Sequence, residues 1–209
     1  PKRIPYGMMN FGHLRRDNCY YVDKTRFIER IEEANKYFFF IRPRRFGKSL
    51  TLSMLAHYYD MNLKDRFDEL FGDLYIGSHP TPERNSYLIL ELNFAAIHAD
   101  LDNYQGAMDS YCRRVFDMFC YRYRHLLPAD TPQKMAATGD AIGMLDLACN
   151  ECQKMGLKMY LFIDEYDHFT NKILSDPSHL DKYRKETHGE GYIRKFYDVI
   201  KDGTNKSIE

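Results

Sequence analysis

The stretch RPRRFGKS at residues 42–49 decides the fold that this sequence predicts. The apolar run YFFFI precedes it at residues 37–41, and a segment with helical periodicity follows at residues 48–60. A continuous apolar run of this length is typical of a strand buried on both faces of a parallel sheet. A strand, a loop with Gly-Lys-Ser and a helix in this order predict a phosphate-binding loop, because the N–H groups at a helix start bind anions.

Individual residues of this loop have predicted roles in binding a nucleotide. Gly47 lets the backbone approach the phosphates, Lys48 brings a positive charge to the β and γ phosphates, and the hydroxyl of Ser49 ligates Mg²⁺. The predicted nucleotide contacts are completed by the neighbours Arg45, Phe46 and Leu50. The usual pattern, G-x-x-x-x-G-K-[ST], has glycine where this sequence has Arg42, so the motif is incomplete. The alternative interpretation is a basic surface turn that caps a helix.

A second motif, MYLFIDE, occupies residues 159–165 and consists of an apolar strand followed by two acids. Ligands of open α/β sheets bind beyond the carboxyl ends of the strands. Asp164 is therefore predicted to hold the Mg²⁺ shell, and Glu165 to polarise the water that attacks the γ-phosphate. Taken alone, the pair fits an acidic turn better than catalysis, but the two motifs in this order favour the catalytic interpretation. Asp167 is predicted to support the site or to cap a helix.

The remaining pattern indicates an α/β fold. Further strands are predicted at residues 19–22 and 87–92, and helices at residues 24–33, 104–124, 141–155 and 192–201. Asp23 and Asp140 are the predicted N-caps of two of these helices. Strands that alternate with helices predict a three-layer core with a mainly parallel sheet and helices on both faces. We expect one domain over residues 1–209, with an N-terminal flank at 1–36 and the core at 37–209.

Composition excludes several classes of protein. Lys+Arg and Asp+Glu both number 30, so the chain lacks the overall basic excess of a protein that coats nucleic acid. Its apolar runs are far shorter than the roughly 20 residues of a membrane helix. The five cysteines are odd in number and sparse, as expected for reduced thiols in the cytoplasm. Cys149 and Cys152 have CxxC spacing, but no second ligand pair lies nearby, which favours a packed helix over a metal or redox site.

Three strings together resemble the AAA-ATPase-like family of prokaryotic P-loop proteins. They are YVDKT at residues 21–25, RPRRFGKSL at 42–50 and IDEYD at 163–167. In that family the missing first glycine is usual. The resemblance implies a P-loop NTPase core that binds ATP with Mg²⁺. Family members often carry a nuclease-like domain of the PD-(D/E)xK type further along the chain, and they place a sensor strand after the last helix of this region.

The sequence ends before that sensor strand, so we expect an incomplete ATPase that belongs to a longer protein. The leading functional interpretation is Mg²⁺-dependent ATP hydrolysis that drives a conformational change in that protein. The alternatives are a nucleotide-dependent switch or scaffold with little hydrolysis and, less favoured, a kinase. Glu165 favours hydrolysis, and the irregular loop favours the switch. No NKxD-type guanine signature is present, which favours ATP over GTP.

The sequence leaves two alternative roles for the arginines outside the Gly-Lys-Ser motif. Arg44 and Arg45 either reach phosphates or an acidic partner, or stay solvated, and neither is identified as an arginine finger by the sequence. The run YRYR at residues 121–124 interleaves aromatic and basic side chains. Base stacking on nucleic acid is one interpretation of this run, and a solvated helix end with arginines near the helix dipole is the favoured one.

Overall fold

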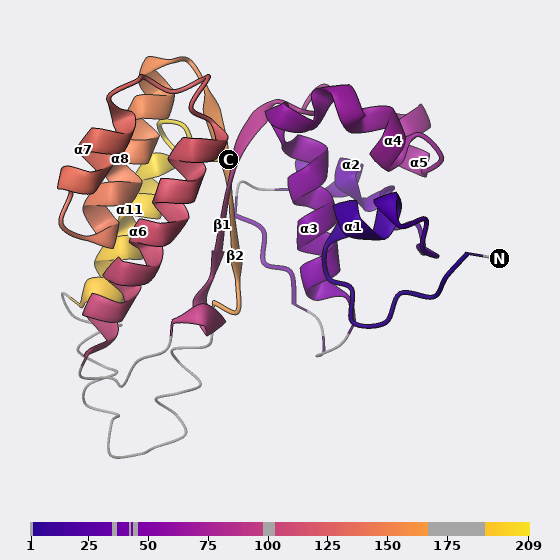
Figure 1. Ribbon diagram of the computed structural model, residues 1–209, viewed down its shortest axis with the longest axis horizontal. Coiled ribbons are helices and arrows are strands. Elements are labelled where there is room, and N and C mark those ends of the chain that lie inside the picture. The colour runs from indigo at the N-terminus through magenta and orange to yellow at the C-terminus, as the bar shows by residue number, and fades with distance from the viewer. Residues whose placement is uncertain (1, 35–36, 42, 44–45, 98–102, 167–190) are drawn as a thin grey trace. The chain divides into compact units, whose positions relative to one another are not determined.

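The computed structural model describes residues 2–34, 37–41, 43, 46–97, 103–166 and 191–209. The chain divides into two compact units, Pro1–Ile89 and Leu90–Glu209, which are coloured indigo to magenta and magenta to yellow in Figure 1. Of the predicted site residues and their neighbours, Arg42, Arg44, Arg45 and Asp167 lie outside the described residues.

The first unit is built from short helices around one long helix. Its elements are α1 (Phe11–Arg16), α2 (Phe27–Glu32), α3 (Lys48–Tyr59), the 3₁₀-helix η1 (Met61–Arg66), α4 (Phe67–Phe71) and α5 (Tyr75–Ser78). Aromatic rings join them, because Phe11 stacks on Phe71 at 5.0 Å between ring centroids and meets Tyr21 edge-on at 5.2 Å. α1 packs against both α3 and α4, so the core of this unit lies beside the helix that follows the predicted loop.

The YVDKT string joins two segments of this unit that lie about 50 residues apart in the sequence. One carboxylate oxygen of Asp23 accepts hydrogen bonds from the backbone N–H and the hydroxyl of Thr25, at 2.8 and 2.7 Å. Its other oxygen accepts from the backbone N–H of Tyr75 at 2.7 Å, and the Thr25 hydroxyl accepts from that of Ile76 at 3.2 Å. The prediction that Asp23 caps the next helix is wrong, because α2 begins only at Phe27 and Asp23 serves the start of α5 instead.

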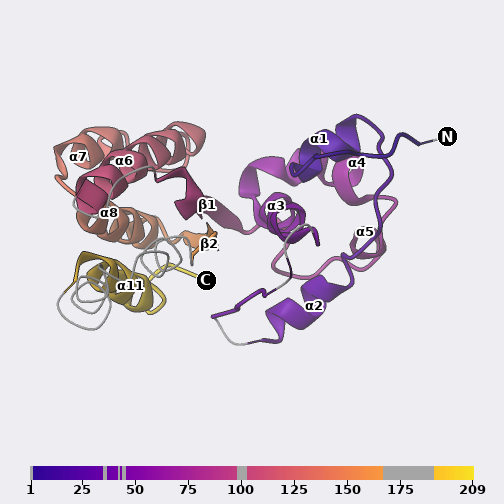
Figure 2. The ribbon, with the colours of Figure 1, turned by 90° about the horizontal axis from the view of Figure 1, so that it is seen from below.

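The second unit packs helices against a two-stranded sheet. Its elements are β1 (Tyr87–Asn93), whose first residues belong to the first unit, η2 (Phe94–Ala96), α6 (Tyr104–Arg122), α7 (Thr131–Ala137), α8 (Ala141–Lys154), β2 (Lys158–Asp164) and α11 (Tyr192–Gly203). β1 and β2 are neighbours and run parallel, and α6, α7 and α8 form the crossover between them. Figure 2 shows these helices and α11 gathered on one side of the two strands.

β2 has a further neighbour at the end of the chain. The N–H of Met159 donates to the carbonyl of Ser207 at 2.6 Å, and the N–H of Glu209 donates back to the Met159 carbonyl at 2.9 Å. Ile208 is buried in this parallel bridge, and the hydroxyl of Ser207 donates to the carbonyl of Cys149 in α8. The residues after α11 therefore supply β2 with a pairing partner that the sequence pattern does not predict.

The apolar run at residues 37–41 is not the buried strand that its composition predicts. It has no regular secondary structure, and Tyr37, Phe38, Phe39 and Ile41 are 49, 47, 69 and 80% exposed. A parallel strand is buried only where strands pair with its edges and helices cover its faces. Among the described residues, the sheet contains only β1 and β2, and residues 37–41 are not part of it. The strand predicted at residues 19–22 is reduced to a single bridge between Cys19 and Arg3.

The mixed α/β class is therefore confirmed, with a two-stranded parallel sheet among the described residues, and the three-layer core stays a prediction. The predicted helices at residues 48–60, 104–124, 141–155 and 192–201 agree with α3, α6, α8 and α11 to within about two residues at each end. Asp140 caps α8 as predicted, because its carboxylate accepts from the N–H of Gly143 at 2.7 Å. The short elements α1, η1, α4, α5 and α7 were not predicted.

The exposed run predicts self-association of the chain in isolation, since contiguous apolar surface of this kind is rare on monomers. Replacing Phe39 and Ile41 together by lysine is expected to shift the chain toward the monomer in sedimentation velocity over a concentration series. The matched control is Val22→Lys, which adds a charge at another exposed apolar side chain. Identical sedimentation of the parent chain and the double variant would contradict the expectation.

Candidate functional site

The predicted loop leads directly into the longest helix of the first unit. α3 begins at Lys48, and its N-cap, Gly47, has φ 78° and ψ 21°. A β-carbon at Gly47 would meet nothing within 4 Å, so the left-handed backbone, and not lack of space, is what favours glycine here. Because an N-cap glycine has no side chain to cap the helix, the first-turn N–H groups of α3 are oriented for an anion.

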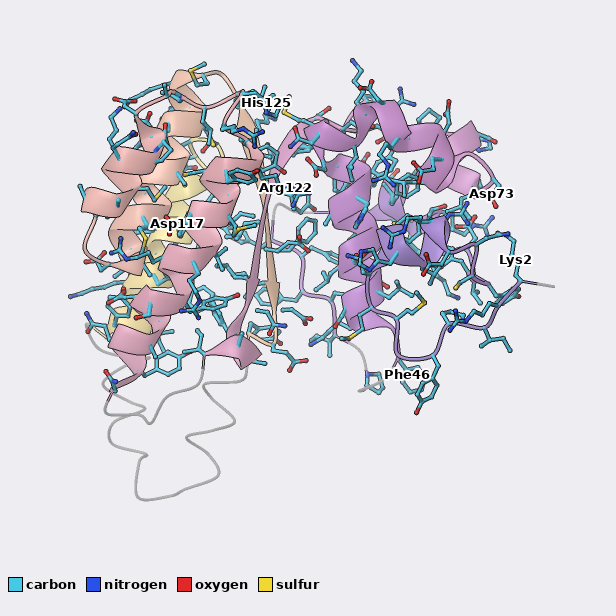
Figure 3. The ribbon with its side chains drawn as sticks, in the orientation of Figure 1. Lys2, Phe46, Asp73, Asp117, Arg122 and His125 are labelled. Carbon is cyan, nitrogen blue, oxygen red and sulfur yellow. The ribbon has the colours of Figure 1, made fainter. Side chains whose placement is uncertain are left out.

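The other described residues of the loop surround this helix start. The N–H of Phe46 donates to the carbonyl of Pro43 at 3.3 Å and closes a turn, and the Phe46 ring is exposed, as its label in Figure 3 helps to show. Lys48, Ser49 and Leu50 are half-buried in the first turn of α3. These predicted site residues, Phe46, Gly47, Lys48, Ser49 and Leu50, are consecutive in the chain and therefore lie together at the start of α3.

Hydrogen bonds hold α3 in place behind the loop. The N–H of Phe11 at the start of α1 donates to the hydroxyl of Ser53 at 3.0 Å. At the far end of α3, the Tyr59 hydroxyl donates to the carboxylate of Glu32 at 3.1 Å, and the Thr81 hydroxyl donates to the same oxygen at 2.8 Å. Burial raises the pKa of Glu32 above its usual value, although these two hydrogen bonds oppose the shift. The helix that carries Lys48 is therefore held at its middle, by Ser53, and at its C-terminal end, by Tyr59.

The second predicted motif forms the end of β2 in the second unit. Asp164 is the last residue of the strand, and both it and Glu165 are half-buried. The backbone N–H of Glu165 donates to the Asp164 carboxylate at 3.0 Å. Glu165 has φ 52°, a left-handed conformation that disfavours residues with a β-carbon by about 1–2 kcal/mol. Strained residues of this kind gather at functional sites, so the backbone supports a special role for Glu165.

Asn93 lies at the edge of the sheet at which the acid pair, Asp164 and Glu165, follows β2. Because β1 and β2 are parallel neighbours, Asn93 ends β1 at the same edge of the sheet at which Asp164 ends β2. The Asn93 N–H donates to the hydroxyl of Tyr111 at 2.7 Å. Sequence reasoning missed Asn93, and the signal that identifies it is a polar residue at the carboxyl end of an apolar strand.

Two tyrosines lie on the same side of the second unit. Tyr166 follows the acid pair directly, and Tyr197 projects from α11. Burial, followed by the negative charge that the Tyr166 phenolate would carry, raises the pKa of Tyr197 to about 12. Tyr197 therefore remains protonated at neutral pH and offers a hydrogen-bond donor close to Tyr166, which follows Glu165.

The chain offers a limited set of metal ligands. Within the described residues, no group of three or more His, Cys, Asp or Glu side chains is arranged to hold a metal ion. Mg²⁺ commonly takes one or two protein ligands together with waters and phosphate oxygens, so Ser49 or Asp164 beside a nucleotide suits it. Cys149 and Cys152 are buried in α8, and burial raises their pKa values to about 11 and about 12. Such thiols are poor ligands and nucleophiles, in agreement with a packed helix.

The predicted residues divide between the two units. Gly47, Lys48 and Ser49 belong to Pro1–Ile89, and Asp164 and Glu165 belong to Leu90–Glu209.

None of the described helices is both long and apolar enough to span a bilayer.

The strain at Glu165 predicts an unusual effect of glycine. Glu165→Gly is expected to be more stable than Glu165→Ala by about 1 kcal/mol, because glycine adopts a positive φ without a β-carbon penalty. Denaturant unfolding of both variants measures the difference. The control pair is Glu69→Gly and Glu69→Ala in α4, where glycine is expected to be the less stable substitution. The same sign at both positions would show that the left-handed turn is absent.

Comparisons with known proteins place the chain in a family. The sequence model of the family described as Predicted AAA-ATPase matches residues 5–209. A similar protein is the "Uncharacterized protein in vnfD 5'region" of Azotobacter chroococcum mcd 1, which is 28% identical over 204 residues. That alignment covers 96% of this chain and 35% of the relative, so the chain spans about a third of the relative's length. No solved structure matches.

The match with the family extends over nearly the whole chain and includes the YVDKT segment, the loop before α3 and the acid pair after β2. The resemblance inferred from three short strings is thereby confirmed, and the chain belongs to the AAA-ATPase-like family.

Proposed function

We propose that the chain binds ATP with Mg²⁺ and hydrolyses it, and that hydrolysis drives a conformational change in a longer protein. The observation that carries this proposal is the left-handed Gly47 at the start of α3, followed by Lys48 and Ser49, in a member of the AAA-ATPase-like family. A helix start of this kind attracts anions through its N–H groups and its dipole. The lysine and the hydroxyl add the two groups that a triphosphate with Mg²⁺ requires.

In the proposed reaction, the residues around Gly47 bind the nucleotide. The backbone of Gly47 approaches the phosphates closely, the ammonium group of Lys48 neutralises charge on the β and γ phosphates, and the Ser49 hydroxyl ligates the metal. Arg45, Phe46 and Leu50 contribute the flanking contacts of the loop. Mg²⁺ supplies charge neutralisation on the β and γ phosphates when it is bound.

The acid pair has two separate roles in the proposed reaction. Asp164 would hold the Mg²⁺ and its shell of waters. Glu165 would take the proton of the attacking water. The left-handed conformation of Glu165 supports a special role for this residue, because strained backbone of this kind gathers at functional sites. Catalysis of this type depends on the positioning of the reacting groups.

A nucleotide-dependent switch or scaffold is the second candidate function. The exposed run at residues 37–41 favours it, because the strand that would fix the loop from behind does not form in the described residues. A loop without that support is expected to bind nucleotide more readily than it positions the γ-phosphate for attack. A turnover assay with and without an acceptor molecule separates hydrolysis from the switch and from a kinase.

The first test concerns binding at the loop. Lys48→Ala is expected to weaken ATP–Mg²⁺ binding about ten- to a hundredfold, because it removes a charge-assisted phosphate contact of roughly 1.5–3 kcal/mol. Isothermal titration calorimetry measures the affinity. Lys64→Ala, at an exposed lysine of η1, is the control and should bind as the parent does. Equal affinities for the parent and Lys48→Ala would refute the proposed loop.

The second test separates the two acids. In the longer protein, Glu165→Gln is expected to keep ATP affinity and to lower kcat by at least about a hundredfold, as loss of a general base does. Asp164→Asn is expected to weaken Mg²⁺-dependent binding as well. Phosphate release and calorimetry measure the two effects, with the exposed Asp68→Asn as control. Turnover at the parent rate in Glu165→Gln would remove Glu165 from the mechanism.

A further inference from the structure

The C-terminal half of α6 presents an apolar stripe to solvent. Arg114, Met118 and Tyr121 follow one another at spacings of four and three residues, so they share one face of the helix. Met118 and Tyr121 are each 65% exposed. The opposite face is buried and carries Met108, Cys112, Phe116 and Phe119. Two large apolar side chains thus lie outside the core, on the face that points away from it.

Three arginines and one acid, Asp117, border this stripe. Arg114, Arg122 and Arg124 are all exposed, and Asp117 is the only acid among residues 110–125. Arg122 and Asp117 are labelled on α6 in Figure 3, as is His125 just beyond its end. Because the whole chain has no net charge, this local excess is a property of the surface and not of the composition.

Two of these arginines lie over aromatic rings. The guanidinium carbon of Arg124 lies 4.5 Å from the ring centroid of Tyr121, and a guanidinium N–H of Arg124 donates to the Tyr121 carbonyl at 3.0 Å. The guanidinium of Arg122 lies 5.4 Å from the ring centroid of the buried Tyr123. Fixing these long side chains in the free protein lowers the entropy lost when they bind a ligand.

We propose that this surface, formed by Arg114, Met118, Tyr121, Arg122 and Arg124 and named the α6 face, binds single-stranded nucleic acid. Bases stack on Tyr121 and pack on Met118, and the arginines contact phosphates. This proposal goes beyond ATP binding. α6 starts after the carboxyl end of β1 and runs back along the sheet, so its C-terminal half lies toward the amino ends of the strands, away from the acid pair.

The chemistry of the α6 face favours a nucleic acid over other partners. An acidic peptide would pair with the arginines but would leave Met118 and Tyr121 uncovered. A second copy of the chain packed on the same face about a two-fold axis would bring like charges together, which is unfavourable. A single strand offers planar apolar bases and regularly spaced negative charges, and therefore satisfies both kinds of side chain.

Binding of a fluorescent oligodeoxythymidine of about 15 nucleotides to the full chain, followed by anisotropy over a salt series, tests the proposal. Tyr121→Ala is expected to weaken binding roughly five- to a hundredfold, as loss of one stacked base does, without changing the salt dependence. The double variant Arg122→Gln/Arg124→Gln is expected to reduce the slope of log K against log salt by about 1.4, since each lost phosphate contact contributes about 0.7.

Matched variants elsewhere on the surface control for general effects. Tyr6→Ala removes another exposed tyrosine, and Lys2→Gln/Arg16→Gln removes two other exposed positive charges. Neither should change the affinity or the slope, and circular dichroism checks that each variant is folded. Lys48→Ala and saturating ATP–Mg²⁺ should leave oligonucleotide binding intact, which separates this proposal from the proposed ATP site. Absent binding, equal losses in the controls, or preference for a polyglutamate peptide over the oligonucleotide would overturn it.

Discussion

The backbone N–H and C=O groups of a strand need partners along both edges, and this requirement decides which predicted strands form. β2 has them, because β1 lies along one edge and residues 207–209 lie along the other. The acid pair follows this doubly supported strand. The apolar run at residues 37–41 is not one of the described strands and is largely exposed, although its composition is that of a buried strand.

The two motifs depend on different contacts. The loop before α3 depends on one left-handed glycine and on a helix fixed by Ser53 and Tyr59, and all of these contacts lie within the first unit. The acid pair depends on β2 and on the left-handed Glu165 in the second unit. Each of the two motifs is therefore built by its own unit, and the match with the family model includes both.

The sequence predicts a structural feature correctly where the residues that form it are close in the chain. The start of α3 at Lys48 and the capping of α8 by Asp140 both depend on residues within one helical turn. Asp23 was misread because its partner, Tyr75, lies in a helix of four residues that periodicity cannot detect. Residues 37–41 were misread because burial depends on tertiary neighbours, and residues 207–209 are too few to show a pattern. The roles of the predicted site residues stay predictions.

The central claim is that the start of α3 binds the phosphates of ATP. Amide chemical shifts of the ¹⁵N-labelled chain, followed during titration with ATP–Mg²⁺, test it most directly. The account predicts that the largest changes occur at Gly47, Lys48 and Ser49, because their N–H groups meet the phosphates. Large changes confined to residues outside the loop, or no changes at millimolar ATP, where even a weak nucleotide site is expected to fill, would contradict it.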